Sequence, residues 1–273
     1  MKENGSLNDR PVLHIGHMAV GIGAPVAVAV IAVTGWQAFI WVTGVSPLVL
    51  PSPWQVGHAL IKERVDLVEA AWCTTCAALI GLAASTVLGV LTAFAFSQSS
   101  IVRRTFYPYA ILLQTVPVIA IAPIIVISFG RGFHSVALVS LVISLFPIIT
   151  NTTTGLLQID AGHLELFKLH SATWWQTLWK LRLPSSLAYV VSGIRIAGGV
   201  AVVGAIVGEF FVGTSQPGLG AMIQRKAAGL AMDELFATVC VSTLLGVTMF
   251  GTITLIGEWI LKRFFGMSLS GVR

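Results

Sequence analysis

The sequence predicts an all-α membrane protein with about six transmembrane helices. Stretches without any Asp, Glu, Lys or Arg recur along most of the chain, and the first extends from Pro11 to Ile61. Hydrophobic residues make up 56% of the chain and charged residues only 10%, whereas soluble domains are nearer a quarter charged. A helix of roughly 20 apolar residues crosses the hydrocarbon core of a bilayer. The stretches lack the alternation typical of barrel strands, so we expect the spanning elements to be helices.

Six segments are long and apolar enough to span. They are Met18–Val42, Leu67–Ser97, Thr105–Phe129, Phe133–Leu156, Ser185–Val212 and Leu235–Phe264. The first exceeds the apolar core of a signal peptide, and no clear small-residue cleavage site follows it. We interpret residues 1–17 as an N-terminal tail and residues 18–273 as one transmembrane domain. Between the first two spans, Trp54–Asp66 has the pattern of a short amphipathic helix at the membrane interface.

The second and fifth spans carry small residues at helical spacing. In the second they are Ala77, Gly81, Ser85, Gly89 and Ala93, and in the fifth Gly193, Ala197, Ala201 and Ala205, with Gly204 and Gly208 in a G-x-x-x-G. Small residues let helix backbones approach closely where lipid gives no hydrophobic drive for association. Static packing is the simpler interpretation, and a face that slides against a neighbouring helix is the alternative.

The third span differs from the others because it contains three prolines. They are Pro108, Pro117 and Pro123. Each proline removes an intrahelical hydrogen bond, so this helix is predicted to be bent or locally unwound. Gln114 and Thr115 lie among them, either as polar lining of a solute path or as partners in interhelical hydrogen bonds.

Two charged residues fall inside the fifth span, where such residues are functional candidates by default. Arg195 and Glu209 are separated by roughly 20 Å at 1.5 Å per residue, so they cannot pair directly. The sequence offers no chain of intramembrane carboxylates or histidines for a proton relay. We therefore take Gln114, Thr115, Pro117, Arg195 and Glu209 as candidates for a translocation pathway.

Lys and Arg are distributed unequally between the two sides of the membrane. Ten of the 16 fall on the side of the N-terminus, five on the other side and one within a span. The positive-inside rule then predicts that both termini face the cytoplasm. The net charge of +5 is explained by topology, and nothing further points to a nucleic-acid partner.

The sequence indicates neither a catalytic centre nor a metal site. Cys73 and Cys76 form a C-x-x-C, but they lie in an apolar helix without a second pair, so we interpret them as packing residues. The six histidines are scattered over separate loops, which argues against a membrane enzyme.

The longest segment on the N-terminal side, Asp160–Pro184, predicts a helix, a sharp turn and a second helix that leads into the fifth span. The turn is expected at Ser171-Ala172-Thr173, and Thr173 with Gln176 fits a capping box. Three exposed tryptophans follow. They suit either a knob that docks into a partner's groove or a tryptophan belt at the interface.

This segment resembles the cytoplasmic loop of permease subunits of bacterial ABC importers, which begins with Glu-Ala-Ala and ends with a hydrophobic-x-Leu-Pro. Glu165-Leu166-Phe167 stands at the Glu-Ala-Ala position, Ser171 at that of a glycine, and Leu181–Pro184 at the ending. The resemblance covers most of the chain. In detail, the sequence is similar to the branch of the family that imports sulfonates, taurine and nitrate. Further matching motifs are Leu50–Pro53, Ala122-Pro123, Phe146–Ile148, Gly193–Ala197, Gly208–Phe211 and Gly218–Gly220.

The resemblance implies a type I ABC importer permease fold in the bacterial inner membrane. It also implies a second permease subunit, as a homodimer, two cytoplasmic subunits that bind ATP and Mg, and an extracytoplasmic solute-binding protein. This chain has no G-x-x-x-x-G-K-[ST] loop of its own for ATP and needs no cofactor. The residues implied to couple to the ATPase subunit are Glu165, Leu166, Phe167, His170, Ser171, Ala172, Thr173 and Trp174.

Three departures from the family pattern affect the coupling loop. Leu166 and Phe167 replace alanines and should require a wider groove in the partner. Ser171 replaces glycine, and a non-glycine residue loses roughly 1–2 kcal/mol at positive φ. Either Ser171 tolerates that strain or the turn uses negative φ. We expect a dedicated ATPase subunit.

The resemblance implies a small organic acid, a sulfonate, a nitrate-like oxoanion or a vitamin precursor as the solute. Selectivity then lies either in the permease or in the binding protein. A secondary transporter or channel is the alternative function, but it would favour inverted repeats or several intramembrane carboxylates.

Overall fold

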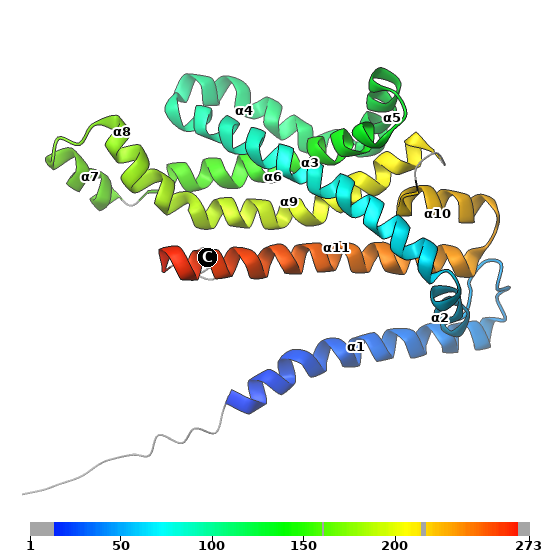
Figure 1. Cartoon of the computed structure of the whole chain (residues 1–273). Coiled ribbons are helices and arrows are strands. Elements are labelled where there is room, and N and C mark those ends of the chain that lie inside the picture. Colours follow the sequence, from blue (N-terminus) through cyan, green and yellow to red (C-terminus); the bar gives the residue numbers. More distant parts are fainter. Residues whose placement is uncertain (1–13, 160, 214–216, 267–273) are drawn as a thin grey trace, which may run out of the picture.

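The computed structural model describes residues 14–159, 161–213 and 217–266, and these residues form helices joined by short connections, without strands (Figure 1). The tail at residues 1–17 therefore lies largely outside the described residues. The α-helices are α1 (His14–Thr43), α2 (Pro53–Lys62), α3 (Arg64–Gln98), α4 (Ser100–Thr115), α5 (Val118–Phe129), α6 (Phe133–Leu157), α7 (Ala161–Leu169), α8 (Trp174–Thr177), α9 (Leu183–Val212), α10 (Leu219–Ala228) and α11 (Met232–Ile260). Two short π-helical turns are η1 (Leu178–Arg182) and η2 (Leu261–Phe265).

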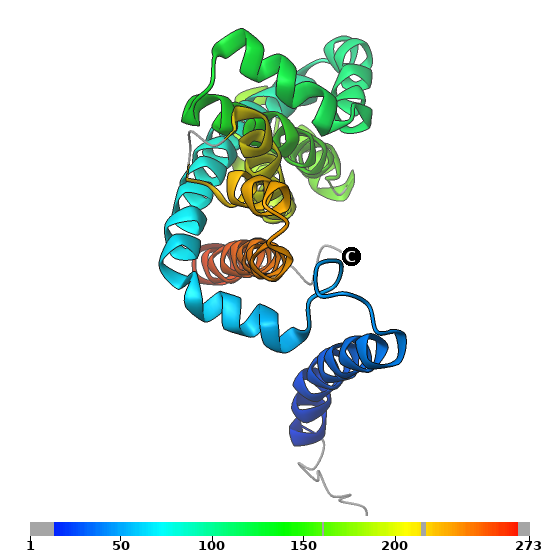
Figure 2. The same cartoon turned by 90° about the vertical axis from the view of Figure 1, so that its right-hand side faces the viewer.

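Within the described residues, five helical segments are long and apolar enough to cross a membrane. They lie at the first, second, fourth, fifth and sixth predicted spans, and the prediction of an all-α membrane protein is confirmed. The helices α3, α6 and α9 form the centre, with α6 packed along both of the others, and α11 lies against α9. Figures 1 and 2 both show α1 set apart from this group. Its contact with the rest includes Trp36, whose ring lies 5.8 Å from that of Phe236 on α11.

The third predicted span is not one helix. It is broken into α4 and α5 at Val116 and Pro117, whose backbones are extended, with ψ of 124° and 121°. Pro117 has no N–H to donate and drives the residue before it out of the helical region. The expected local unwinding is thus confirmed at Pro117 alone, because Pro108 and Pro123 lie inside helices that continue through them.

The small-residue stripes of α3 and α9 are buried against α6. Ser140 of α6 lies at the centre of this contact, and its Oγ donates to the backbone oxygen of Ala201 on α9 at 2.9 Å. A Cβ at Gly204 would come within 2.8 Å of the Ser140 Cα. These small residues therefore allow the helix backbones to approach each other closely in this structure.

The predicted interface helix is shorter than expected at its C-terminal end. Ser52 and Gln55 form a capping box that starts α2. The helix ends at Lys62, and α3 begins two residues later, so Arg64–Asp66 belong to the second span rather than to the interface helix.

Candidate functional site

The segment after α6 folds as the predicted helix, turn and helix, and Figure 1 shows α7 and α8 projecting beyond one end of the helix bundle. The turn is built on Ser171, whose φ is +52°. The Ala172 N–H donates to the oxygen of Phe167 at 3.0 Å, and the Ser171 N–H donates to that of Lys168 at 2.9 Å. This pair of bonds closes the C-terminus of α7 as a Schellman motif, with serine at the position usually held by glycine. Ser171 therefore adopts the strained positive φ.

The second helix begins with the predicted capping box. Thr173 Oγ1 accepts from the Gln176 N–H at 3.3 Å, and the Gln176 side-chain oxygen accepts from the Thr173 N–H at 2.8 Å. The helix then runs without a stop through η1 into α9, in agreement with the prediction that it leads into the fifth span. The Leu183 N–H bonds to Leu178 in a widened turn directly before Pro184, which accommodates the missing proline donor inside a continuous helix.

The coupling residues predicted from the sequence gather on this projection. A pocket of about 350 Å³ between the two helices is lined by Leu166, Phe167, His170, Ala172, Gln176 and Lys180. Leu166 is 50% exposed and Leu169 82% exposed. Trp174 and Trp175 pack edge to face with ring centroids 4.7 Å apart, and both are exposed. Glu165 is exposed on α7. The projection thus presents large apolar side chains that no other part of the described residues covers.

The pathway candidates do not form one cluster. Gln114 and Thr115 are exposed at the end of α4, next to the break at Pro117. The Arg195 guanidinium lies 5.3 Å from the centre of the Phe250 ring on α11. Its buried Nε has no hydrogen-bond partner among the described residues. Arg195 therefore stacks on a neighbouring helix.

Glu209 lies 1% exposed where α3, α9 and α10 meet. Its Oε1 is 2.9 Å from the Thr74 hydroxyl, and its Oε2 accepts from the Gly220 N–H at 2.7 Å. The Leu219 N–H donates to Thr74 Oγ1 at 2.9 Å. A Cβ at Gly218 would overlap the Glu209 carboxylate. Glu209 and Thr74 therefore cap the N-terminus of α10, where backbone N–H groups lack partners within the helix.

Sequence reasoning missed the partners of Glu209. A signal was present, since an acid buried in an apolar helix needs donors, and Gly218–Gly220 forms the N-cap and first residues of a helix. The glycines leave room for the carboxylate to reach the backbone N–H groups.

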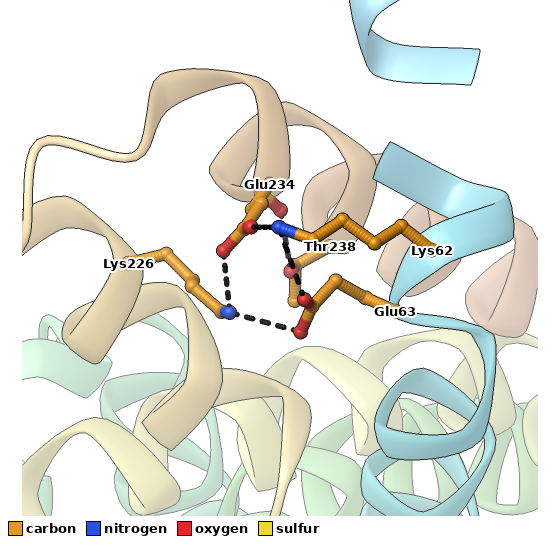
Figure 3. Close-up of polar contacts among 5 residues, drawn as sticks. All are labelled: Lys62, Glu63, Lys226, Glu234 and Thr238. Carbon is orange, nitrogen blue, oxygen red and sulfur yellow. Dashed lines mark hydrogen bonds and ion pairs between the residues drawn. The ribbon is translucent and has the colours of Figure 1, made fainter. Parts of the chain in front are cut away.

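A second group that the sequence did not predict joins α2, the link between α2 and α3, α10 and α11 (Figure 3). It lies at the end of the bundle opposite α7 and α8 (Figure 1). Lys226 Nζ lies 2.6 Å from Glu234 Oε2 and 3.0 Å from Glu63 Oε2. Lys62 Nζ lies 2.8 Å from Glu234 Oε1. Burial opposes the charged form of Lys226, but its hydrogen bonds to Glu234 and Glu63 outweigh this and raise its pKa. The hydrogen bond to Glu234 likewise raises the pKa of Lys62. We call these four residues the clasp.

No group of three or more His, Cys, Asp or Glu side chains that could hold a metal occurs in the part of the chain that the structure describes. Cys73, Cys76 and Cys240 are free thiols.

Comparison with known proteins identifies similar chains. The model of the family described as "binding-protein-dependent transport system inner membrane component" matches residues 85–265. The chain is 37% identical over 212 residues to the formylaminopyrimidine transport permease protein ThiX of Halalkalibacterium halodurans, covering 76% of this chain and 82% of that protein. It is 30% identical over 230 residues to the riboflavin transport system permease protein RibX of Chloroflexus aurantiacus, covering 84% of each. It is also 28% identical over 248 residues to the taurine transport system permease protein TauC of Escherichia coli, covering 88% of this chain and 86% of that protein.

Proposed function

The chain belongs to the family of binding-protein-dependent transport system inner membrane components, and from this we propose that its α7–α8 projection couples it to a separate ATPase subunit. The chain is a transmembrane permease subunit of an ABC importer, with several membrane-spanning helices. The predicted resemblance, including the branch that contains sulfonate and taurine permeases, is confirmed. The coupling residues, the partners and the orientation below are proposals that proceed from this family membership.

One observation supports the coupling role most strongly. The Schellman turn at Ser171 and the capping box at Thr173 fix α7 against α8, and the pair carries exposed Leu166, Leu169 and Trp174. Large apolar side chains on a rigid tip are typical of residues that anchor a protein interface. The tip continues through η1 into α9 without a break. A push on the tip therefore moves α9, which packs along α3, α6 and α11.

The proposed assembly contains two copies of this permease, two cytoplasmic subunits that bind and hydrolyse Mg-ATP, and an extracytoplasmic solute-binding protein. The distribution of Lys and Arg supports cytoplasmic termini. In that orientation α7 and α8 face the ATPase subunits, and the clasp lies on the side where a binding protein delivers solute. Residues 18–273 act as one permease domain in this proposal, with coupling residues 160–184.

The solute that we propose is a small organic acid, a sulfonate, a nitrate-like oxoanion or a vitamin precursor. The names of the similar permeases refer to formylaminopyrimidine, riboflavin and taurine transport. Gln114, Thr115, Pro117 and Arg195 remain the proposed pathway residues. The exposed Gln114 and Thr115 at a broken helix support this, because irregular backbone at membrane depth is tolerated where it lines a cavity. For Glu209 we propose an indirect part, through the position of α10.

The coupling proposal is tested with the assembled importer in proteoliposomes. Trp174→Ala should lower ATP-driven uptake and the recovery of the ATPase subunit with the permease by about tenfold or more, because an anchor residue commonly contributes about 2 kcal/mol to binding. Trp259→Ala is the control, since Trp259 is also exposed but lies on α11, at 62% against 44% for Trp174. Equal effects of the two substitutions contradict the proposal. Uptake by the permease alone, driven by an ion gradient, would support the alternative of a secondary transporter.

A further inference from the structure

A pocket of about 370 Å³ lies between the first half of α4 and the C-terminal part of α6, at the end of the bundle from which α7 and α8 project. Its walls are Arg103, Arg104, Tyr107, Pro108, Thr153, Thr154 and Leu157. The volume falls in the range of small-ligand sites, which begins near 300 Å³. None of the roles proposed above uses these residues.

The charge of this pocket is unbalanced. Arg103 is half-buried and Arg104 is exposed, and neither makes an ion pair within the described residues. The pocket walls contain no acidic residue. The first turn of α4 also lacks one, although negative charge is the kind that a helix N-terminus favours. The two guanidinium groups therefore lie near the positive N-terminal end of α4, and no acidic side chain on the pocket walls balances their charge.

The walls also offer polar groups beside the arginines. Thr153 is 3% exposed, and its Oγ1 has no hydrogen-bond partner in the part of the chain that the structure describes. Buried hydroxyl groups are normally paired. The half-buried Tyr107 adds a phenol to the same wall. An incoming oxygen atom would thus meet hydroxyl donors as well as two cations.

We propose that this pocket binds an oxoanion, a phosphate- or sulfonate-type group held by Arg103 and Arg104. The guanidinium fork donates two parallel hydrogen bonds to such groups, which a lysine cannot do. The group has two possible sources, the headgroup of an anionic phospholipid or a free oxoanion in solution. For the headgroup, apolar surface lies close by on α4, since Ile101 is 76% and Phe106 55% exposed. The proposal does not depend on the coupling role of α7 and α8.

The first arm of the test measures lipid binding by the full-length permease in its assembled importer. The protein is placed in phosphatidylcholine vesicles with spin-labelled phosphatidylglycerol, and electron paramagnetic resonance gives the preference over spin-labelled phosphatidylcholine. Arg103→Gln/Arg104→Gln should lower that preference by about tenfold, since each arginine near a headgroup strengthens binding severalfold. Lys262→Gln/Arg263→Gln is the matched control, because it removes the same charge from η2 at the same end of the bundle.

The second arm identifies a free oxoanion. The importer in a neutral, lipid-free detergent is titrated with inorganic phosphate or sulfate, and its melting temperature is compared with that in chloride of equal ionic strength. If phosphate or sulfate raises the melting temperature of the parent protein but not that of the Arg103/Arg104 double variant, the site binds a free oxoanion. If the double variant loses only the lipid preference measured in vesicles, the site binds a lipid headgroup. Either result supports the proposal. It is overturned if neither arm responds to these arginines, or if the Lys262/Arg263 control loses as much.

If the Arg103→Gln/Arg104→Gln variant does not assemble into the importer, a milder variant still tests the proposal. Arg103→Lys/Arg104→Lys retains both charges but loses the fork geometry. We expect binding about threefold or more weaker in the responding arm, because bidentate pairs are stronger than single charge-assisted bonds. Unchanged binding in both arms would overturn the proposal.

Discussion

The Thr74 hydroxyl lies 2.9 Å from Oε1 of Glu209, and this contact joins α3 to α9 at the point where α10 begins. Thr74 also accepts from the Leu219 N–H, and Glu209 accepts from the Gly220 N–H. A buried acid in an otherwise apolar helix is therefore satisfied by a hydroxyl and by the unpaired donors of the next helix. The position of α10 depends on these two side chains.

Glu209→Gln is expected to lower the free energy of unfolding by about 1–3 kcal/mol, because the amide NH₂ replaces one acceptor and faces a donor. Thr74→Val should cost a similar amount, since it removes the oxygen that accepts from Leu219. Thermal unfolding of the purified importer measures both. Thr75→Val is the control, because among the described residues the Thr75 hydroxyl bonds only to the Ala71 oxygen of its own helix. A Thr75 variant as unstable as the Thr74 variant would contradict the role given to this contact.

The spans were predictable because their signal is local, namely long apolar runs with no charge. The break at Pro117 was only partly predictable. All three prolines of that span remove a donor, but only Pro117 ends a helix, whereas Pro108 and Pro123 lie within continuous helices. Which of the prolines interrupts a helix depends on the packing against neighbouring helices, and the sequence alone does not show that packing.

The turn of the projection was predicted from Thr173 and Gln176, whose capping box is a short-range pattern. The sign of φ at Ser171 was left open, because a serine at a glycine position tolerates either outcome. Glu209 was noted as a charge in a span, but its donors come from residues 11 and 135 positions away. Single-sequence reasoning finds local caps far more easily than such distant pairs.

Gly204→Ala should lower the stability of the permease by about 1–3 kcal/mol, because overpacking at a close helix crossing forces the backbones apart. The added Cβ would come within 2.8 Å of the Ser140 Cα and 3.0 Å of the Ile143 Cδ1. Gly199→Ala is the matched control on the same helix, since no atom of the described residues lies within 4 Å of its Cβ position. The control should be neutral or slightly stabilising, because alanine favours the helix. Urea or thermal unfolding compares the two, and equal losses would contradict a close crossing at Gly204.

Lys226→Met should destabilise the end of the bundle that carries the clasp by about 1–3 kcal/mol, because it leaves Glu63 and Glu234 partly buried without their shared cation. The side chains of these glutamates are only 16% and 15% exposed. Lys62→Met is the control and should have a smaller effect, since the Lys62 side chain is 59% exposed. Hydrogen exchange of α10 measures the local loss. Equal exchange in the two variants would contradict a central place for Lys226.

The clasp should also respond to alkaline pH. The pKa of Lys226 is raised above its ordinary value of 10.5. A group whose pKa is higher in the folded state stabilises fully below its unfolded pKa, and that stabilisation is lost as the pH rises through the folded value. Stability from Lys226 should therefore be constant near neutral pH and fall only above about 10.5. The Lys226→Met variant should lack the part of the stability loss at alkaline pH that comes from Lys226. An identical alkaline profile in the variant and the parent protein would contradict it.

Ser171→Gly should stabilise the projection by up to about 1 kcal/mol, because glycine relieves the strain of positive φ while it adds freedom to the unfolded chain. Ala172→Gly is the adjacent control. Positive φ is found at Ser171 but not at Ala172, so this change should bring only the entropic loss, with the opposite sign. Protection of α7 against hydrogen exchange reports both, and a destabilising Ser171→Gly would contradict the strain.

The α7–α8 projection should also restrict which ATPase subunit the permease can bind. Leu166 and Phe167 line the pocket between α7 and α8, and Leu166 is half exposed. A partner groove shaped for two alanines cannot admit these larger side chains without overpacking, which commonly costs about 1–3 kcal/mol. Leu166→Ala/Phe167→Ala/Ser171→Gly should therefore gain ATP-driven uptake with an ATPase subunit from a relative that has the Glu-Ala-Ala loop, and lose it with its own. Uptake assays of both pairings in proteoliposomes measure this. If the altered loop works with the foreign subunit no better than the native loop does, side-chain size at Leu166 and Phe167 does not select the partner.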